Sequence, residues 1–544
     1  MPFLENYRQT LDWFLGPEPA AKPQHLGPRW IFLRALGLIY FSAFYSLLFQ
    51  IKGLIGPDGL LPAREFLEAV AHYFNGAQRF WYVPSLLWFR SGDRMLATLC
   101  WIGIAASLLL IVNVWPRGML AICFVAYVSF VSAARDFSGY QSDGMLLEAG
   151  LISMFFAPPG FWPGLGRRHA PSRASLFLLR WEWFRIYFES GVAKLASGDQ
   201  SWRHLTAMDD YYQNGPLPTW IGWYAQQLPH WFHAGTAFFT LLAEILLVWM
   251  LFLPRRFRII CFFIVTPFEI SIILTANYTF LNYLVLSLGF LLLDDKFLAF
   301  LLPARWKGIL STRGDAPNQK GETPAPLGDG FFPKLRDVFT TARLALAAFL
   351  LAWLFYATSS QILGMLLPSV PLPQKPGALL EPFRVADQYG LFANMTHERR
   401  EIEFQGTRDE KTWIAYPFRY KPQDVSKPPG IYAPYQPRFD WNLWFASLGP
   451  WRGYPFVVYT EERLLKNTPD VVALFAGNPF DGSPPVAVRA VLWQYWFTDK
   501  KTRLQDGNWW RREVLGLYCP ALEREPDGTI QMLESQSQAP PPEP

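Results

Sequence analysis

The stretch WIFLRALGLIYFSAFYSLLFQI at residues 30–51 decides the class of this chain. An α-helix rises 1.5 Å per residue, so a run of this length crosses the roughly 30 Å hydrocarbon core of a bilayer. Other apolar stretches follow, and each is interpreted as a membrane helix or a shorter re-entrant segment. They lie at residues 96–115, 118–134, 144–157, 175–197, 232–253, 259–276, 279–293 and 344–366. The sequence therefore predicts about eight or nine spans.

The composition agrees with a membrane protein. Only 17% of the 544 residues are charged, against roughly 25% in an average soluble protein. This shortage excludes a disordered chain, and a net charge of +5 provides no electrostatic surface for nucleic acid. The four cysteines are scattered, so no disulfide framework or metal site is predicted. The sequence also contains no G-x-S-x-G, P-loop or H-E-x-x-H motif, so no familiar catalytic class is indicated.

Basic residues orient the chain across the membrane. With nine spans, the loops on the N-terminal side hold 18 Lys and Arg residues, and the opposite loops hold 7. Because positively charged loops stay in the cytoplasm, the N-terminus is expected to be cytoplasmic. The predicted order is a cytoplasmic segment (1–29), a multi-span helical domain (30–310), a cytoplasmic linker (311–343) and a last transmembrane helix (344–366). Everything after that helix is then lumenal in a eukaryote or periplasmic in a bacterium.

The composition changes after the last span. Residues 380–523 contain runs in which apolar and polar residues alternate, the pattern of strands with one buried face. These runs are Arg400 to Gln405, Thr412 to Tyr420, Val486 to Thr498 and Trp509 to Tyr518. Residues 524–544 are polar and Pro-rich, which predicts a disordered tail. The predicted fold class is thus a polytopic α-helical membrane domain followed by a β-rich soluble C-terminal domain.

Ionisable residues inside a span are expensive, so those of residues 175–197 need an explanation. Glu182, Arg185 and Glu189 are spaced i, i+3 and i+7, which places them on one helical face. We expect them to form structural ion pairs that point into the helical bundle. Lys194 lies near the extracytoplasmic end of the same helix. It either reaches the membrane interface as a cationic anchor or points into a cavity and acts as a base.

Three polar segments fall on the predicted extracytoplasmic face. They are the turn DFSGYQSDG (136–144), the loop SGDQSWRHLTAMDDYYQNGPLPTW (197–220) and the turn ANYTFLN (276–282). Because the β-rich domain is expected on the same side, we predict that these segments and that domain share one site. The alternative is that polar loops merely lie where water is. The residues assigned to this shared face are Asp143, Trp202, Arg203, His204, Asp209, Asn277 and Asn282.

Eight distinctive motifs follow one another along the chain. They are SDGMLLEAGL, RWEWFRIYFESGVAKL, SWRHLTAMDDYYQNGPLP and TANYTFLNYL, then YGLFANMTHERREIEFQGT, YAPYQPRFDWNLWFA, NPFDGSPP and NWWRREVLGLY. This series resembles the lipase maturation factor family. The resemblance runs from about residue 30 to 523. It implies a membrane chaperone without a cofactor, in the endoplasmic reticulum of a eukaryote or the inner membrane of a bacterium, that helps secreted lipases or similar clients to fold and assemble. Exposed tryptophans such as Trp441 and Trp444 would contact the client, unless they form the core of the β-rich domain.

A second, more distant resemblance covers only the helical half. YFESGVAKL followed by Trp202 is similar to the segment of vitamin K-dependent γ-glutamyl carboxylase that carries its catalytic lysine, and Lys194 falls on that lysine. This implies an alternative function, a membrane enzyme that uses a quinone-type lipid cofactor with Lys194 as the base. The two hypotheses differ in what the chain binds, a client protein or a cofactor.

Overall fold

The computed structural model describes residues 10–11, 14–16, 24–301, 303, 331–373 and 375–533. Most of the predicted N-terminal segment, the predicted linker up to residue 330 and the end of the chain from residue 534 lie outside the described residues. The rest forms a helical region up to residue 366, followed by a C-terminal region that contains all the strands described.

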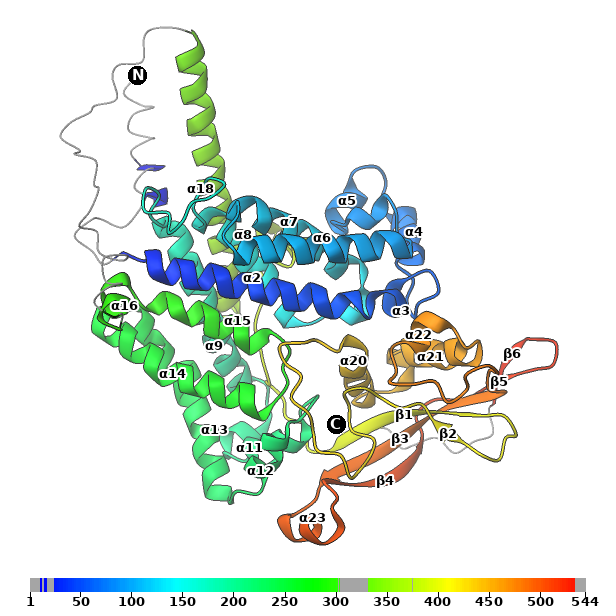
Figure 1. Ribbon diagram of the computed structural model, residues 1–544. Helices are drawn as coiled ribbons and strands as arrows, with labels where there is room; N and C mark the ends of the chain where they lie inside the picture. Colours follow the sequence, from blue (N-terminus) through cyan, green and yellow to red (C-terminus); the bar gives the residue numbers. More distant parts are fainter. Residues whose placement is uncertain are drawn as a thin grey trace.

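Helices build the first region (Figure 1). The long ones are α2 (Leu26–Leu48), α6 (Asp93–Ile111), α7 (Pro116–Ala133), α8 (Gln141–Phe156), α9 (Arg173–Ala196), α13 (His230–Ile245), α14 (Arg255–Thr275) and α18 (Phe331–Leu366). The shorter ones are α3 (Ile51–Ile55), α4 (Ala63–Tyr73), α5 (Gln78–Tyr82), α10 (Gln200–Arg203), α11 (Ala207–Asn214), α12 (Trp220–Gln226), α15 (Leu281–Gly289), α16 (Asp295–Leu301) and, after α18, α19 (Lys375–Ala378).

Six helices among the described residues are long and apolar enough to cross a membrane, which fits an integral membrane protein. They are α2, α6, α7, α13 continued by the 3-10 helix η3 (Leu247–Phe252), α14, and α18 from residue 338 onward. Three other predicted spans are also helical but do not qualify. Helix α8 has 16 residues, the apolar helix over Leu281–Leu292 is shorter still, and α9 carries six ionisable residues. Helix α9 packs against α8, α13, α15 and α18, so these charges lie among other helices.

Glycines allow close approach at two places in the helical region. A Cβ atom at Gly103 in α6 would lie 2.5 Å from the ring of Phe44 in α2, which is closer than real contacts allow. A Cβ atom at Gly53 in α3 would lie 2.4 Å from the carbonyl oxygen of Asp470 in the C-terminal region. The first glycine brings two membrane helices together, and the second brings the two regions together.

An antiparallel sheet forms the centre of the C-terminal region. Its strands are β1 (Arg399–Thr407), β2 (Ile414–Ala415), β3 (Ala487–Phe497), β4 (Trp510–Leu517), β5 (Leu522–Arg524) and β6 (Ile530–Met532). They follow the order β2-β1-β3-β5-β6, and β4 pairs with β3. Helices α20 (Arg438–Ser447), α21 (Phe456–Leu465) and α22 (Pro469–Val472) lie between β2 and β3 in sequence, and α23 (Lys500–Asp506) lies between β3 and β4. The predicted fold class is therefore confirmed, with inserted helices added to the sheet.

Two expectations for the tail are wrong in detail. The run from Thr412 to Tyr420 is a strand only at Ile414–Ala415, because Pro417 has no N–H group to donate to a neighbouring strand. The predicted disorder also starts too early. Strands β5 and β6 pair with each other, with Glu523 opposite Gln531, so ordered structure continues past residue 524.

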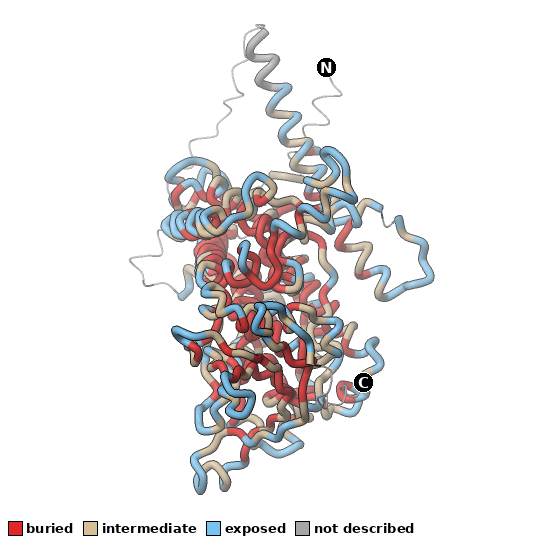
Figure 2. Tube along the Cα trace, turned by 90° about the vertical axis from the view of Figure 1, so that its right-hand side faces the viewer, coloured by how far each residue is buried: buried red, intermediate tan, exposed pale blue. Residues whose placement is uncertain are grey.

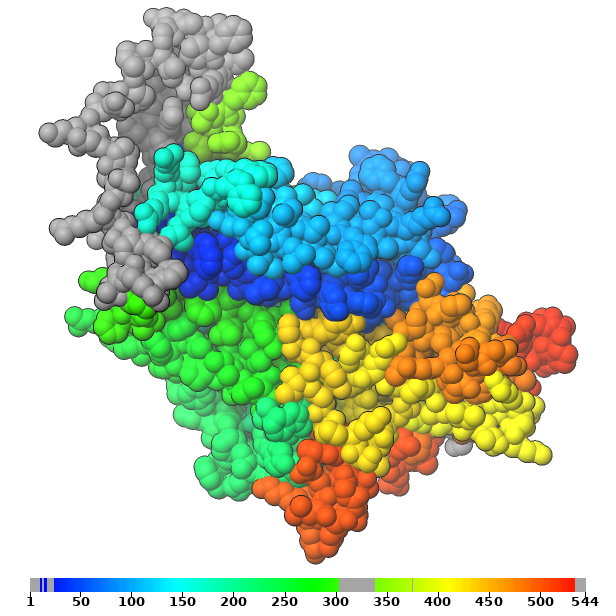
Figure 3. Space-filling view, in the orientation of Figure 1, coloured from blue at the N-terminus to red at the C-terminus, as the bar shows by residue number. Residues whose placement is uncertain are grey.

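The two regions share one apolar core. A single cluster of buried side chains reaches from Phe32 in α2 to Leu522 in β5. Figure 2 shows buried segments in both regions, and Figure 3 shows the first part of the C-terminal region, in yellow, directly against α2 and the green helices. The C-terminal region is thus docked on the helical region.

Candidate functional site: polar clusters between the regions and a buried cavity

A buried ion pair joins α8 to α20 across the boundary. The Arg438 guanidinium donates hydrogen bonds to both carboxylate oxygens of Asp143, at 2.9 Å from Nη1 and 2.8 Å from Nη2. The Tyr127 hydroxyl donates to the same carboxylate at 2.5 Å, and Arg438 also donates to the carbonyl oxygen of Phe137. Because loss of either charged partner would leave an uncompensated buried charge, this pair fixes the C-terminal region in one position.

Asn277 connects the same two regions in the turn between α14 and α15. Its amide nitrogen donates to the carbonyl oxygens of Gly430 at 2.9 Å and Leu217 at 3.1 Å. Its amide oxygen accepts the backbone N–H groups of Tyr432 at 2.6 Å and Ala433 at 3.0 Å. One side chain therefore satisfies backbone groups from two separate segments, one in each region.

The loop after α9 contacts the segment that leads into β1. The Asp199 carboxylate accepts the backbone N–H of Met395 at 2.6 Å. The Trp202 indole N–H donates to the carbonyl oxygen of Phe392 at 2.9 Å. These contacts, with those of Asp143 and Asn277, bring all three predicted polar segments against the C-terminal region.

Arg185 is the centre of a second buried cluster. Its Nη1 lies 2.6 Å from Glu148 Oε1 on α8, and its Nε lies 3.1 Å from Glu189 Oε1 on its own helix. Tyr389 of the C-terminal region donates its hydroxyl to Glu148 at 2.9 Å and its backbone N–H to Glu189 at 2.7 Å. The structure thus contains the expected pair of Arg185 with Glu189. Glu182 is buried too, but it forms no ion pair with any residue that the structure describes.

Lys194 lies on the wall of a cavity, with 2% of its side chain exposed. Its Nζ donates to both carboxylate oxygens of Glu244 on α13, at 2.9 Å each, and to the carbonyl oxygen of Leu391 at 2.8 Å. The Trp202 ring centroid is 5.1 Å from the ammonium nitrogen. The Lys194 side chain is therefore buried at the cavity with its ammonium paired to Glu244, and it does not reach the surface as an anchor would.

The cavity has a volume of about 420 Å³ and a second acidic group. Glu269 on α14 accepts hydrogen bonds from the Tyr187 hydroxyl and, at 2.8 Å, from the Asn282 amide. The other residues that line the cavity are largely apolar or aromatic and include Ile186, Met208, Phe239, Ile264, Val285 and Phe392. Mostly apolar walls, a few converging polar groups and a volume between roughly 300 and 1,000 Å³ are typical of small-molecule sites.

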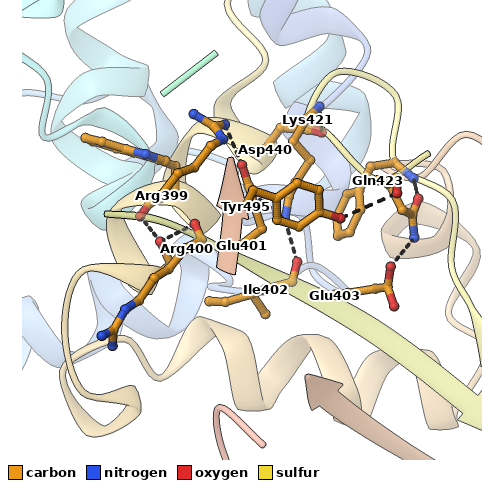
Figure 4. Close-up of polar contacts among 12 residues, drawn as sticks. Arg399, Arg400, Glu401, Ile402, Glu403, Lys421, Gln423, Asp440 and Tyr495 are labelled. Atoms are coloured by element: carbon orange, nitrogen blue, oxygen red, sulfur yellow. Dashed lines mark hydrogen bonds and ion pairs between the residues drawn. The ribbon is translucent and has the colours of Figure 1, made fainter. Parts of the chain in front are cut away.

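The C-terminal region has a polar cluster beside β1 (Figure 4). Lys421 Nζ lies 2.9 Å from Glu401, which also pairs with Arg399. Arg399 donates to carbonyl oxygens at 213–216 in the helical region, so this cluster reaches across the boundary as well. Burial raises the pKa of Asp440 to about 6, although its carboxylate accepts the backbone N–H of Lys421 at 3.2 Å, which opposes that shift.

Both regions match known families. Residues 27–300 match the lipase maturation factor transmembrane domain, and residues 385–520 match the lipase maturation factor C-terminal domain. The chain belongs to the lipase maturation factor family. It is 32% identical to lipase maturation factor 1 of Homo sapiens over 534 residues, which are 94% of this chain and 91% of that protein. Lipase maturation factor 2 of Gallus gallus is 30% identical over 91% of this chain and 81% of its own length. No solved structure matches the chain.

The other residues assigned to the shared face do not make contacts with the C-terminal region like those of Asp143, Trp202 and Asn277. Asn282 lines the cavity. Arg203 and His204 are exposed. The Arg203 guanidinium donates a hydrogen bond to the carbonyl oxygen of Leu195, near the end of α9. Asp209 pairs instead with two imidazoles of α13, those of His230 at 2.9 Å and His233 at 3.0 Å.

The tryptophans expected at the client surface are buried. Trp441 and Trp444 lie on α20 with 8% and 7% exposed, so the expected exposure is wrong. The Trp441 ring lies 6.0 Å from that of Tyr140 and 6.2 Å from that of Tyr278, both in the helical region. Helix α20 presents these rings inward because it lies between β1 and the helical region.

Several residues of these clusters were missed in the sequence. Glu148, Glu244 and Glu269 lie within predicted apolar stretches. Charged residues in a membrane span need an explanation, as argued for residues 175–197, and the same argument identifies these three. Arg438 gives no such signal, because it follows a Pro-rich loop in the soluble part of the sequence.

Two of the donors at the cavity are not available to the quinone-type cofactor of the alternative hypothesis. Quinone carbonyls only accept hydrogen bonds, but all three N–H groups of the Lys194 ammonium already have acceptors inside the protein. The Tyr187 hydroxyl likewise donates to Glu269. Within the described residues, no group of three or more His, Cys, Asp or Glu side chains is arranged to hold a metal ion.

Proposed function

We propose that this chain is a membrane-anchored maturation factor that helps secreted lipases, or similar secreted clients, to fold and assemble. The names of its relatives support this, because they are lipase maturation factors 1 and 2. The observation that carries the proposal is the docking of the C-terminal region through the buried pair of Asp143 and Arg438. A chaperone that acts on a client at a membrane needs its client-binding surface held at that membrane. This ion pair holds the C-terminal region against the helical region.

The proposed orientation has a cytoplasmic N-terminus, a cytoplasmic linker at 311–343 and a lumenal or periplasmic C-terminal region, in the endoplasmic reticulum of a eukaryote. The asymmetry of basic residues supports it. Single cysteines at Ser426, which is exposed, and at Asp315 test it with a membrane-impermeant thiol reagent on intact microsomes or spheroplasts. The four native cysteines are buried, which keeps the background low. We expect labelling from opposite sides, and equal labelling from one side contradicts the orientation.

Exposed apolar side chains of the C-terminal region are the proposed client contacts, in place of the buried tryptophans. They are Ile414, Ile431, Tyr459, Leu504 and Val514. Leu504 lies in α23 and Val514 in β4, and they are 84% and 55% exposed. Single exposed apolar side chains are common on protein surfaces. Only the effect of their substitution on a client therefore identifies them as client contacts.

A rescue experiment tests the proposed function. In cells that lack their own lipase maturation factors, the wild-type chain should raise the ratio of lipase activity to lipase protein in the medium several-fold. The double variant Leu504→Asp/Val514→Asp should lose most of that gain. Tyr73→Asp, at an equally exposed site on α4, is the matched control and should keep it. No rise with the wild-type chain contradicts the function, and equal loss with the control contradicts the assigned surface.

The second function, a membrane enzyme with Lys194 as the base, rests on the burial of Lys194 beside a cavity. The ion pair with Glu244 opposes it, because a base needs a free amine. Extraction of a bound quinone from the purified chain favours the enzyme, whereas co-purified lipase favours the maturation factor.

A further inference from the structure

The cavity beside Lys194 opens between α13 and α14. Gly235 on α13, and Pro267 and Ser271 on α14, line the cavity and are also exposed, so they form its mouth. Both helices are membrane-span candidates with few buried residues. They present large apolar side chains outward, namely Phe238, Leu246, Trp249, Phe263, Ile270 and Leu274. In a bilayer this surface faces hydrocarbon, so the mouth opens sideways into lipid.

The inner end of the cavity offers hydrogen-bond acceptors. A carboxylate has about four lone-pair sites, and the contacts described for Glu244 and Glu269 use two on each. The Lys194 ammonium has no N–H group left to donate. Because its ammonium already pairs with Glu244, Lys194 also offers no free positive charge to an anionic group.

We propose that this cavity binds a neutral lipid with hydroxyl groups at its polar end. The hydroxyl groups donate to Glu244 and Glu269, and the hydrocarbon chain lies along the apolar walls and leaves through the mouth into the bilayer. A fatty acid or a phospholipid phosphate does not fit, because each brings negative charge. A quinone brings only acceptors and gains no hydrogen bond from the Lys194 ammonium. The proposal does not depend on a lipase client, since it concerns a cavity whose mouth and two carboxylates belong to the helical region.

A photoreactive monoacylglycerol with a diazirine in its acyl chain is the probe. The full-length chain in neutral-lipid nanodiscs is irradiated, and labelled peptides are mapped by mass spectrometry. We expect labelling on α13 and α14. The dimethyl ether of the same probe, which has lost its hydroxyl donors, and the corresponding fatty acid should both label at least about tenfold less, equivalent to about 1.4 kcal/mol.

Cavity-filling variants separate this site from general contact with lipid. A Cβ atom at Gly235 meets nothing within 4 Å, so Gly235→Leu fits the helix and fills the mouth. Gly364 on α18 is also exposed with nothing within 4 Å, so Gly364→Leu is the matched control. Ser271→Leu narrows the mouth from the other helix and serves if the first variant does not fold.

Gly235→Leu and Ser271→Leu should each reduce labelling on α13 and α14 by about tenfold or more, and Gly364→Leu should leave it unchanged. Three results overturn the proposal. They are wild-type labelling in a folded mouth variant, equal labelling by the dimethyl ether, and displacement of the probe by a short-chain quinone as readily as by unlabelled monoacylglycerol. The lipase rescue assay can fail while the labelling result stands, so the two proposals fail separately.

Discussion

Two buried ion pairs of this chain have the same chemistry and different surroundings. Arg438 and Asp143 form a two-pronged pair that also receives the Tyr127 hydroxyl, and neither residue lines the cavity beside Lys194. Lys194 and Glu244 form a pair that lines a cavity of about 420 Å³. The first pair joins two regions of the protein, whereas the second leaves room for a ligand. Whether a buried ion pair holds two regions together or forms part of a binding site therefore depends more on the space beside the pair than on its charges.

The largest expected effect comes from breaking the joint. Arg438→Met leaves the Asp143 carboxylate buried without a cation, which should lower the free energy of unfolding by about 3–5 kcal/mol. Thermal unfolding of the detergent-solubilised chain, followed by fluorescence-detected size exclusion, measures this. The double variant Asp143→Leu/Arg438→Met removes both charges and should recover part of the loss. A double variant less stable than Arg438→Met would contradict the ion-pair explanation.

Asn277→Ala tests the same boundary without a charge. The substitution leaves the backbone N–H groups of Tyr432 and Ala433 without their acceptor, so a loss of about 2 kcal/mol is expected. Asn113→Gly is the control, because the Asn113 side chain makes one hydrogen bond, to Gly164 away from the boundary, and glycine tolerates its positive φ of 67°. Equal melting temperatures for the two variants would show that Asn277 does not hold the regions together.

Asp440 extends the comparison to a buried carboxylate whose pKa is raised from 3.8 to about 6. Asp440 then binds a proton more tightly in the folded chain than in the unfolded chain, so its contribution to stability is greatest below about pH 4 and is lost as the pH rises through about 6. The expected fall is about 3 kcal/mol. Asp440→Asn should remove this part of the pH dependence, as measured by melting temperature between pH 4 and 8. The same slope in both proteins would contradict the assignment.

The smallest effect is expected for Lys194→Arg. An arginine keeps the cationic partner of Glu244 but cannot act as a base. The maturation hypothesis therefore predicts a rescue of lipase activity within about twofold of wild type. Lys194→Met, which leaves Glu244 unpaired, is the contrasting variant and should lower the amount of folded protein. Complete loss of function in a well-folded Lys194→Arg chain would favour the enzyme hypothesis.

The sequence predicts those features that depend on local periodicity. Residues 30–51 correspond to α2 and α3, and the alternation from Val486 to Thr498 corresponds to β3. It also places Arg185 beside Glu189, because helical spacing alone brings them together. Trp444 was open to two interpretations because an aromatic run looks the same in a core and on a surface.

The rest depends on contacts between distant residues. Asp143 and Arg438 are 295 positions apart, and no local pattern connects them. Glu244 meets Lys194 from a helix 50 positions away. The cavity itself has no sequence signal, because it is a space left between α9, α13 and α14 and not a property of any one of them.

Site-specific photo-crosslinking to a newly made lipase tests the central claim most directly. A photoreactive amino acid is placed at Val514 in the C-terminal region and, in parallel, at Arg256, which is exposed at the start of α14 on the proposed cytoplasmic side. During lipase synthesis, the chain should form a crosslink to the lipase from position 514 and none from position 256. Crosslinks from both positions, or only from position 256, would contradict a maturation factor that meets its client on the docked C-terminal region.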